Sequence, residues 1–80
     1  MTVTVMTRKD CPACAAAESD IRRICTELGV EWTVEDVDTD PEWRAEYGDR
    51  VPVILIDGLE HGYWKVEEDR LRQALRQALR

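Results

Sequence analysis

The chain begins with residues that alternate between polar and apolar, and then changes to a helical spacing of apolar positions. Residues 2–7 alternate threonine with valine or methionine, which is the period-two pattern of a β-strand. Residues 12–28 open with proline and several alanines and then repeat apolar side chains at helical spacing up to Leu28. Because Gly29 follows, at the position where glycine ends many helices, the pattern predicts a strand and then one long helix.

Further strands and helices follow in turn. The patterns predict strands at residues 30–37, 51–56 and 59–65, and helices at residues 42–47 and 67–80. Asp40-Pro41 provides a side-chain cap and a first-turn proline for the shorter helix. Residues 51–56 are apolar on both faces, so this strand should lie inside the sheet, with Pro52 as its first residue. Asp57-Gly58 is a strong signal for a tight hairpin to the last strand.

This order of elements restricts the topology of the sheet. A strand, a helix and a strand in one sheet give parallel strands with a right-handed crossover, whereas the hairpin gives an antiparallel pair. The sequence therefore predicts an α/β domain of the order β-α-β-α-β-β-α, with a four-stranded mixed sheet of strand order 2-1-3-4. The first and last helices should cover one face of the sheet and the short helix the other. With 80 residues, the chain has room for a single domain, residues 1–80.

Composition limits the partners and the location that we expect. The 17 acidic and 11 basic side chains give a formal net charge of -6, so the surface on average repels nucleic acid and anionic lipid. The opening residues are too short and too alternating for a signal peptide, and the longest apolar run, residues 51–56, is far below the ~20 residues of a membrane span. We therefore expect a cytoplasmic protein that binds neither nucleic acid nor membrane, and we take it to be a monomer.

Two of the cysteines form the motif Cys11-Pro12-Ala13-Cys14 at the predicted start of the first helix. Residues three apart on a helix have Cα atoms about 5 to 6 Å apart, a separation that a disulfide tolerates. At a helix start, free backbone N–H groups and the helix dipole favour negative charge, so the Cys11 thiol should lose its proton more readily than an ordinary thiol of pKa ~8.5. The motif therefore predicts a nucleophilic Cys11 and a more buried Cys14 that attacks a mixed disulfide on Cys11.

Charged residues before the motif act on this thiolate in opposite directions. Arg8 and Lys9 favour the negative charge on Cys11, whereas Asp10 opposes it by like-charge repulsion. We expect a modest net effect of these residues.

The cysteine motif alone leaves other interpretations open. The two cysteines are also consistent with ordinary buried residues or with half of a metal site. A zinc site needs four ligands, but Cys25 on the same helix lies about 16 Å from Cys14 by the helical rise. Cys25 is more simply a core residue, and His61 is more often a hydrogen-bonded structural histidine than a functional one. We therefore favour redox chemistry and expect no metal.

Two features later in the chain bear on substrate binding. An ordinary trans proline at a strand start is the simpler interpretation of Val51-Pro52. If the bond is cis, the backbone N–H and C=O of Val51 are left unpaired and can pair an incoming peptide beside Cys11. Trp64, next to Tyr63, is consistent with packing at the edge of the sheet or with the border of a substrate groove.

Together these residues resemble the glutaredoxin branch of the thioredoxin superfamily, and within it the small bacterial glutaredoxin-like proteins. The resemblance runs from Val3 to about Leu79. It rests on the following motifs: Cys11-Pro12-Ala13-Cys14, Val51-Pro52 and the Asp57-Gly58 hairpin. It implies a thioredoxin-like (glutaredoxin) fold, a nucleophilic Cys11, a resolving Cys14 and a cis-proline at Pro52 beside the disulfide.

The chain departs from the glutaredoxin pattern at two places. Ala13 stands where dithiol glutaredoxins usually have an aromatic residue. The family's Gly-Gly followed shortly by Asp, which holds the γ-glutamyl end of glutathione, is absent, and this chain has Glu60-His61-Gly62-Tyr63-Trp64 instead.

The leading hypothesis is a thiol-disulfide oxidoreductase that reduces protein or low-molecular-weight disulfides through Cys11 attack and Cys14 resolution. We expect Arg8, Lys9, Val51 and Pro52 to contact the substrate. We expect no bound cofactor, and the reductant is glutathione, another small thiol or a thioredoxin-type reductase. Two alternatives remain: a binding module with this fold whose cysteines do not turn over, and an iron-sulfur or metal-binding dimer that uses Cys11 of each subunit.

Overall fold

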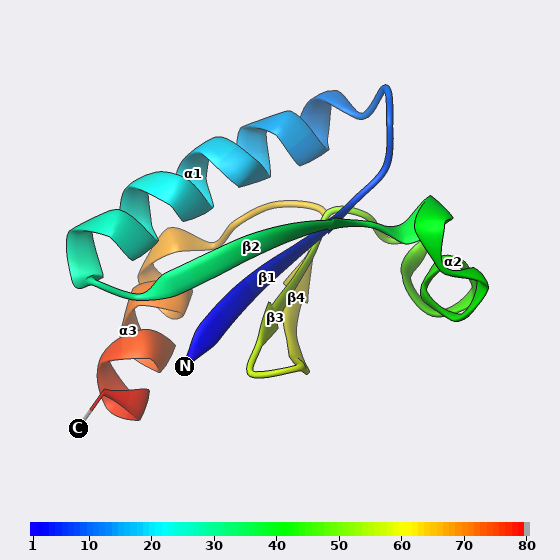
Figure 1. Ribbon diagram of the computed structural model, residues 1–80. Coiled ribbons are helices and arrows are strands. Elements are labelled where there is room, and N and C mark those ends of the chain that lie inside the picture. Colours follow the sequence, from blue (N-terminus) through cyan, green and yellow to red (C-terminus); the bar gives the residue numbers. More distant parts are fainter. Residues whose placement is uncertain (80) are drawn as a thin grey trace.

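The computed structural model of the chain describes residues 1–79 and contains a four-stranded sheet with helices on both faces (Figure 1). In chain order the elements are β1 (Thr2–Thr7), α1 (Pro12–Leu28), β2 (Glu31–Asp36), the 3-10 turn η1 (Val37–Thr39), α2 (Pro41–Tyr47), β3 (Val53–Ile56), β4 (Leu59–Tyr63) and α3 (Glu68–Ala78). Arg80, which we expected in the final helix, lies outside the described residues.

The strand order is β2-β1-β3-β4, as the sequence predicted. β1 pairs in parallel with β2, and Thr7 lies opposite Asp36. β1 pairs antiparallel with β3, and Met6 lies opposite Val53, while the hairpin joins β3 antiparallel to β4. Because β1 and β3 run in opposite directions, the carboxyl end of β1 and the amino end of β3 lie at the same edge of the sheet.

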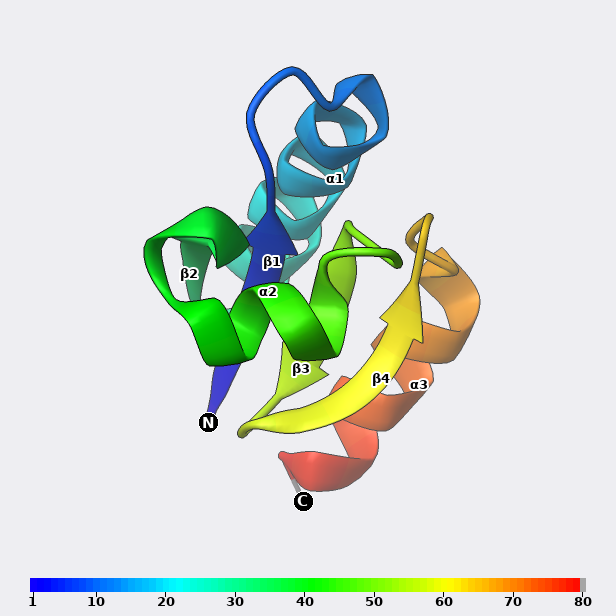
Figure 2. The ribbon, with the colours of Figure 1, turned by 90° about the vertical axis from the view of Figure 1, so that its right-hand side faces the viewer.

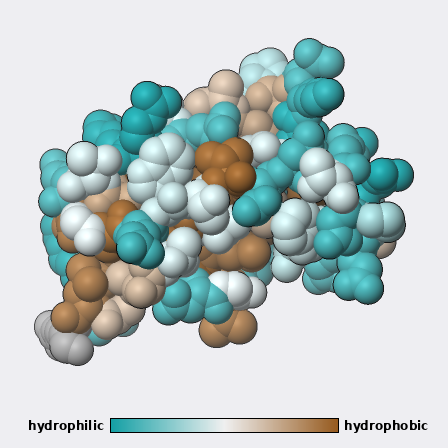
Figure 3. All heavy atoms as spheres, viewed as in Figure 1, coloured by the Kyte–Doolittle hydropathy of each residue, from teal (hydrophilic) through white to brown (hydrophobic). Residues whose placement is uncertain are grey.

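Two hydrophobic clusters fill the space on either side of the sheet, and they confirm the predicted placement of the helices. On one face, the buried residues of α1 and α3, among them Ile21 and Leu75, pack against Val5. On the other face, Trp43 of α2 packs against a cluster that includes Met6. Figure 2 shows α2 alone on its side of the sheet. Over the face seen in Figure 1, hydrophilic side chains predominate and apolar ones appear in separate patches (Figure 3).

Local signals explain the end of α1, the start of α2 and the hairpin. Gly29 ends α1 in the left-handed conformation, with φ of 70°, and its N–H reaches the carbonyls of the last turn. Asp40 caps α2 by accepting a hydrogen bond from the Glu42 N–H at 2.8 Å, and Pro41 occupies the first turn. At the hairpin, both Asp57 and Gly58 have positive φ, of 50° and 83°, as a two-residue turn of this kind requires.

Three of the four strands differ from the prediction in their bounds: β2 spans Glu31–Asp36 and not residues 30–37, and the differences at β3 and β4 are larger. β3 begins at Val53, so Pro52 precedes the strand and is not its first residue; a proline has no N–H to donate to the ladder. β4 ends at Tyr63 and not near Lys65, because Trp64 adopts a φ of 69° and leaves the extended conformation. The turn η1 after β2 was also not expected, and there the Asp36 side chain accepts a hydrogen bond from the Asp38 N–H.

Charged side chains join the outer surfaces of α1 and α3. The Glu68 carboxylate accepts hydrogen bonds from Arg23 at 2.8 Å and from Arg72 at 2.9 Å. Arg72 also pairs with Glu27. These two guanidinium groups hold the pKa of the Glu68 carboxyl at about 2, below its usual value of 4.5.

Replacement of Leu75 by Ala should lower the free energy of unfolding by about 2 to 5 kcal/mol, because its side chain is fully buried between α3 and the sheet. The matched control is Leu59→Ala, since Leu59 is 76% exposed, and its effect should stay below about 1 kcal/mol. Chemical denaturation measures both values. Equal effects of the two substitutions would contradict the core that we describe.

The Glu68 cluster should stabilise the fold in a pH-dependent way. Its pKa is lower in the folded chain than in the unfolded chain, so its contribution is present above about pH 4.5 and is lost as the pH falls toward about 2. The difference in unfolding free energy between the wild type and Glu68→Gln should therefore shrink over this range. Glu31→Gln removes an exposed carboxylate outside the cluster and serves as the control. A difference that is constant with pH would rule out the ion cluster.

Candidate functional site

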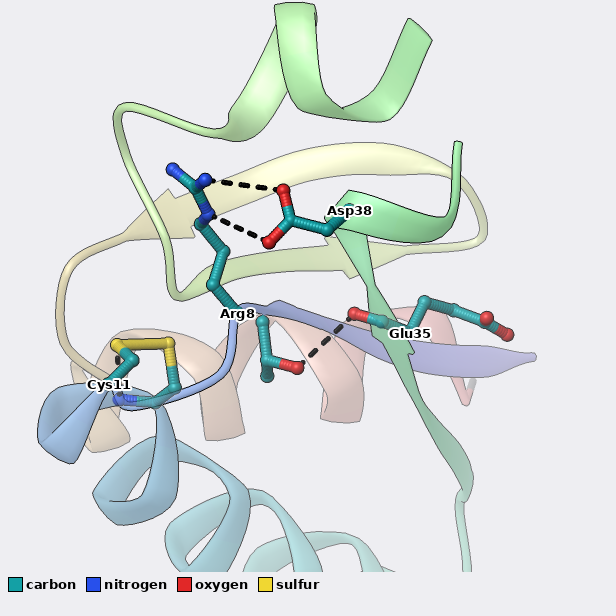
Figure 4. The surroundings of a disulfide bond; sticks show 6 residues. Arg8, Cys11, Glu35 and Asp38 are labelled. Atoms are coloured by element: carbon teal, nitrogen blue, oxygen red, sulfur yellow. Dashed lines mark hydrogen bonds and ion pairs between the residues drawn. A yellow bond between two sulfur atoms is a disulfide. The ribbon is translucent and has the colours of Figure 1, made fainter. Parts of the chain in front are cut away.

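The cysteine motif lies at the first turn of α1, at the carboxyl end of the central strand β1. Cys11 is the residue that caps the helix, in an extended conformation with φ of -117° and ψ of 97°, and Pro12 follows at the first helical position. The Cys14 backbone N–H donates to Cys11 Sγ at 3.1 Å. Cys11 and Cys14 form a disulfide, and their Cα atoms are 5.1 Å apart (Figure 4). The helix start therefore directs a hydrogen-bond donor at the sulfur of Cys11.

The two cysteines differ in exposure. Cys14 is 2% exposed, whereas Cys11 is only partly buried. Both line an open surface hollow of about 590 Å³, together with residues such as Thr7 and Arg8. A molecule that enters this hollow therefore reaches the sulfur of Cys11 before that of Cys14.

Arg8 does not point at the disulfide. Its Nε and Nη2 atoms each lie 3.2 Å from a carboxylate oxygen of Asp38, and Figure 4 shows the guanidinium directed at this carboxylate. Asp38 also pairs with Arg44 at 3.3 Å. Because the positive charge of Arg8 is compensated in this way, the helix start is the main support for a thiolate at Cys11. The contact of Arg8 and Lys9 with a substrate stays a prediction.

The Val51–Pro52 peptide bond is cis, as the resemblance implied. Pro52 is buried and its carbonyl accepts a hydrogen bond from the Trp64 N–H at 2.8 Å, whereas Val51 is partly buried. Neither the strand pairing, which begins at Val53, nor the loop hydrogen bonds of residues 1–79 include the backbone of Val51. The segment lies at the edge of the sheet where β1 leads toward Cys11, so Val51 offers free backbone groups at this edge.

Sequence reasoning missed Asp38. Its partner Arg8 is separated from it by 30 residues, and the two meet because parallel pairing places the ends of β1 and β2 side by side. Thr7 at this end donates its hydroxyl hydrogen bond to the Glu35 carbonyl at 3.3 Å (Figure 4). The acidic run at residues 36–40 was the only indication in the sequence of an ion pair here, and it does not by itself specify which basic residue is the partner.

The other residues considered from the sequence lie apart from the disulfide. Cys25 is fully buried in the core, and burial raises the pKa of its thiol. His61 lies on β4, where burial and the nearby charge of Arg70 lower its pKa, and its Nε2 atom has no hydrogen-bond partner within residues 1–79.

Among residues 1–79, no three His, Cys, Asp or Glu side chains are grouped to hold a metal ion. None of the helices between residues 1 and 79 has the length and apolar character to cross a membrane.

The strand order and the position of the disulfide assign the protein to the class of proteins with a thioredoxin-like fold. Thioredoxin 1 from Thermosipho africanus TCF52B has this fold, with a TM-score of 0.67 over the full length of both chains and 18% identity. A structural-genomics target protein from X. campestris reaches a TM-score of 0.74 at 28% identity, over 94% of this chain and 96% of that chain.

Sequence comparison narrows the class to a family. The model of the Glutaredoxin-like domain (DUF836) matches residues 2–76, so the chain belongs to the glutaredoxin-like family. An uncharacterized protein of Mycobacterium tuberculosis and one of Mycobacterium bovis are each 43% identical to it over 75 residues, which cover 88% of this chain and 77% of theirs. The fold, the family and the disulfide-bonded cysteine pair together indicate a role in thiol-disulfide redox chemistry.

In the reduced protein at pH 7, iodoacetamide should modify Cys11 at least about ten times faster than Cys14, because alkylation requires an accessible thiolate. Cys11 is the more exposed cysteine and receives a backbone hydrogen bond that favours its thiolate. Cys25 is fully buried and should react only after denaturation. Mass spectrometry of the digested protein measures the three rates. Modification of Cys14 or Cys25 ahead of Cys11 in the folded protein would contradict this assignment.

Proposed function

We propose that the protein is a dithiol oxidoreductase that reduces disulfides, with Cys11 as nucleophile and Cys14 as resolving cysteine. The observation that carries this proposal is the Cys14 N–H directed at Cys11 Sγ, 3.1 Å away, at the start of a 17-residue helix. A thiolate at this position gains a hydrogen bond and the favourable end of the helix dipole. The buried sulfur of Cys14 is within bonding reach of it, which supplies the second step.

The reaction exchanges one disulfide for another. The Cys11 thiolate attacks one sulfur of the substrate disulfide; the Cys11–substrate bond forms, the substrate S–S bond breaks, and the other substrate sulfur leaves as a thiolate that takes a proton from water. Cys14 then loses its proton and attacks Cys11 Sγ, which releases the second substrate thiolate. The substrate gains two electrons and two protons, and the product on the protein is the Cys11–Cys14 disulfide present in this structure.

Substrate contacts in this proposal come from two segments of the chain. The free backbone groups of Val51, beside the buried Pro52, are suited to pair with an extended segment of a protein substrate. Arg8 lines the hollow that contains the two cysteines, and Lys9 follows it in the chain. In this proposal both contact the substrate, and Arg8 exchanges its contact with Asp38 for a carboxylate of the substrate.

The electron source follows from the same chemistry. We propose that the protein works in the reducing cytoplasm without a bound cofactor, and that a low-molecular-weight thiol such as glutathione or a thioredoxin-type reductase converts its disulfide back to the dithiol. Reduction of the oxidised protein by glutathione and by thioredoxin reductase, followed side by side, identifies the donor.

The function is tested with a protein disulfide substrate and dithiothreitol as reductant. Cys11→Ser should reduce turnover to the uncatalysed rate because the nucleophile is absent. Cys14→Ser is reduced first and mixed with the substrate after the dithiothreitol is removed; the Cys11–substrate disulfide should then accumulate, and mass spectrometry detects it as an adduct. Cys25→Ala removes the buried thiol outside the motif and serves as the control, with turnover retained. Unchanged turnover in Cys11→Ser would refute the proposal.

A further inference from the structure

Tyr63 and Trp64 lie at the same edge of the sheet as the disulfide. The Trp64 N–H donates to the Pro52 carbonyl at 2.8 Å, and Pro52 immediately precedes β3 at the edge where β1 ends. Figure 2 shows the carboxyl ends of β1 and β4 at the end of the molecule where α1 begins. The two aromatic residues therefore lie at the same end of the sheet as the disulfide, two strands away from β1, and they line a separate hollow.

The conformation of the aromatic pair is unfavourable for the isolated chain. Trp64 is 61% exposed and Tyr63 is 46% exposed, which leaves much of their apolar surface in water. Trp64 also has a φ of 69°, a region that a bulky residue rarely adopts because its side chain then crowds the backbone. The two rings pack edge to face, with centroids 5.0 Å apart, and so present one continuous aromatic surface. Strain and exposure at one residue point to a binding role.

The pair forms part of the wall of a hollow of about 630 Å³. The charged side chains that line it balance, since Glu60 and Glu67 oppose Lys65 and Arg70. Two of these side chains also have partners within the fold. Glu60 forms an ion pair with Arg50 at 2.6 Å, and Arg70 donates a hydrogen bond to the His61 carbonyl at 2.7 Å. The hollow therefore has no large excess of either charge, and its distinctive feature is the aromatic surface.

A protein segment suits this combination better than a small charged thiol does. Free backbone groups at Val51 are suited to hold an extended chain next to Cys11. Such a chain presents side chains at regular intervals along one side, so one of them can meet the aromatic surface while a cysteine meets the disulfide site. Glutathione has charged ends and no apolar side chain, and it would leave the aromatic surface uncovered.

We propose that Tyr63 and Trp64 form a specificity subsite that receives an apolar side chain near the disulfide of a protein substrate. This inference rests on the proposed oxidoreductase function and names its substrate class: protein disulfides with an apolar residue nearby, in preference to glutathione disulfide. The indole of Trp64 contributes most of the contact, because it is the larger and more exposed of the two rings.

The test uses two peptides with the same internal disulfide, one with Leu and one with Ser at a position near a cysteine, and glutathione disulfide as a third substrate. The wild type should have a kcat/KM about ten-fold higher for the Leu peptide than for the Ser peptide, mainly through a lower KM. In Trp64→Gly, which suits the positive φ, the ratio of the two peptides should fall to near one. Trp64→Phe should restore a preference for the Leu peptide, and Leu59→Ala, at the hairpin end of β4, should keep the wild-type ratio.

The outcomes separate this inference from the proposed function. If the wild type reduces both peptides at equal kcat/KM, or favours glutathione disulfide over the Leu peptide, the subsite is absent and the oxidoreductase function stands. If no substrate is reduced, the proposed function fails; a cysteine-free Leu peptide that still shifts the Trp64 indole N–H signal in NMR spectra then supports the subsite. No shift with this peptide overturns it.

Discussion

The antiparallel pairing of β3 with the central strand β1 is the constraint on which the site depends. This pairing puts the start of β3 beside the end of β1, and the parallel pairing of β1 with β2 adds the end of β2 to the same edge. These two pairings bring four features to the same end of the sheet: the loop that carries Cys11, the ion pair at Asp38, the Val51–Pro52 segment and Trp64. A small sheet thereby brings distant parts of the chain to the end at which the disulfide lies.

Negative charge on the Cys11 sulfur would be stabilised more by the backbone than by neighbouring side chains. The group that reaches Cys11 Sγ is a peptide N–H, whose position is fixed by the first turn of α1. Of the neighbouring cations, Arg8 is bound to a carboxylate and Lys9 is exposed. A thiolate that depends on helix geometry tolerates changes in the charges around it. The same reasoning explains how the motif accommodates Ala13, a residue that adds neither charge nor contact area.

The sequence predicted the fold well because its signals are local. The alternation in β1, the capping residues at Asp40 and Gly29 and the turn at Asp57-Gly58 each determine the structure within a few residues. The two-cysteine motif at a helix start is likewise local, and its placement was correct. The cis form of Val51–Pro52 came only from the resemblance, since most such bonds are trans.

What the sequence did not reveal depends on contacts between distant segments. β4 ends earlier than predicted, at the residue before Trp64, whose N–H donates a hydrogen bond to the Pro52 carbonyl. Neither Trp64 nor Pro52 by itself predicts this hydrogen bond. Arg8 was expected to act on Cys11, but strand pairing brings it to Asp38. Side-chain partners at a sheet edge are set by register, which a pattern of apolar residues specifies only after the whole sheet is assembled.

The burial of Cys25 has a consequence for the fidelity of the redox pair. Its sulfur lies in the same core cluster as Val3 and Ile24, with no exposed surface. An unfolded chain would offer three thiols of similar reactivity, and wrong pairings would form by exchange. Folding withdraws one of them and leaves Cys11 with a single neighbour. The apolar core of this protein therefore also keeps Cys25 from forming a disulfide with Cys11 or Cys14.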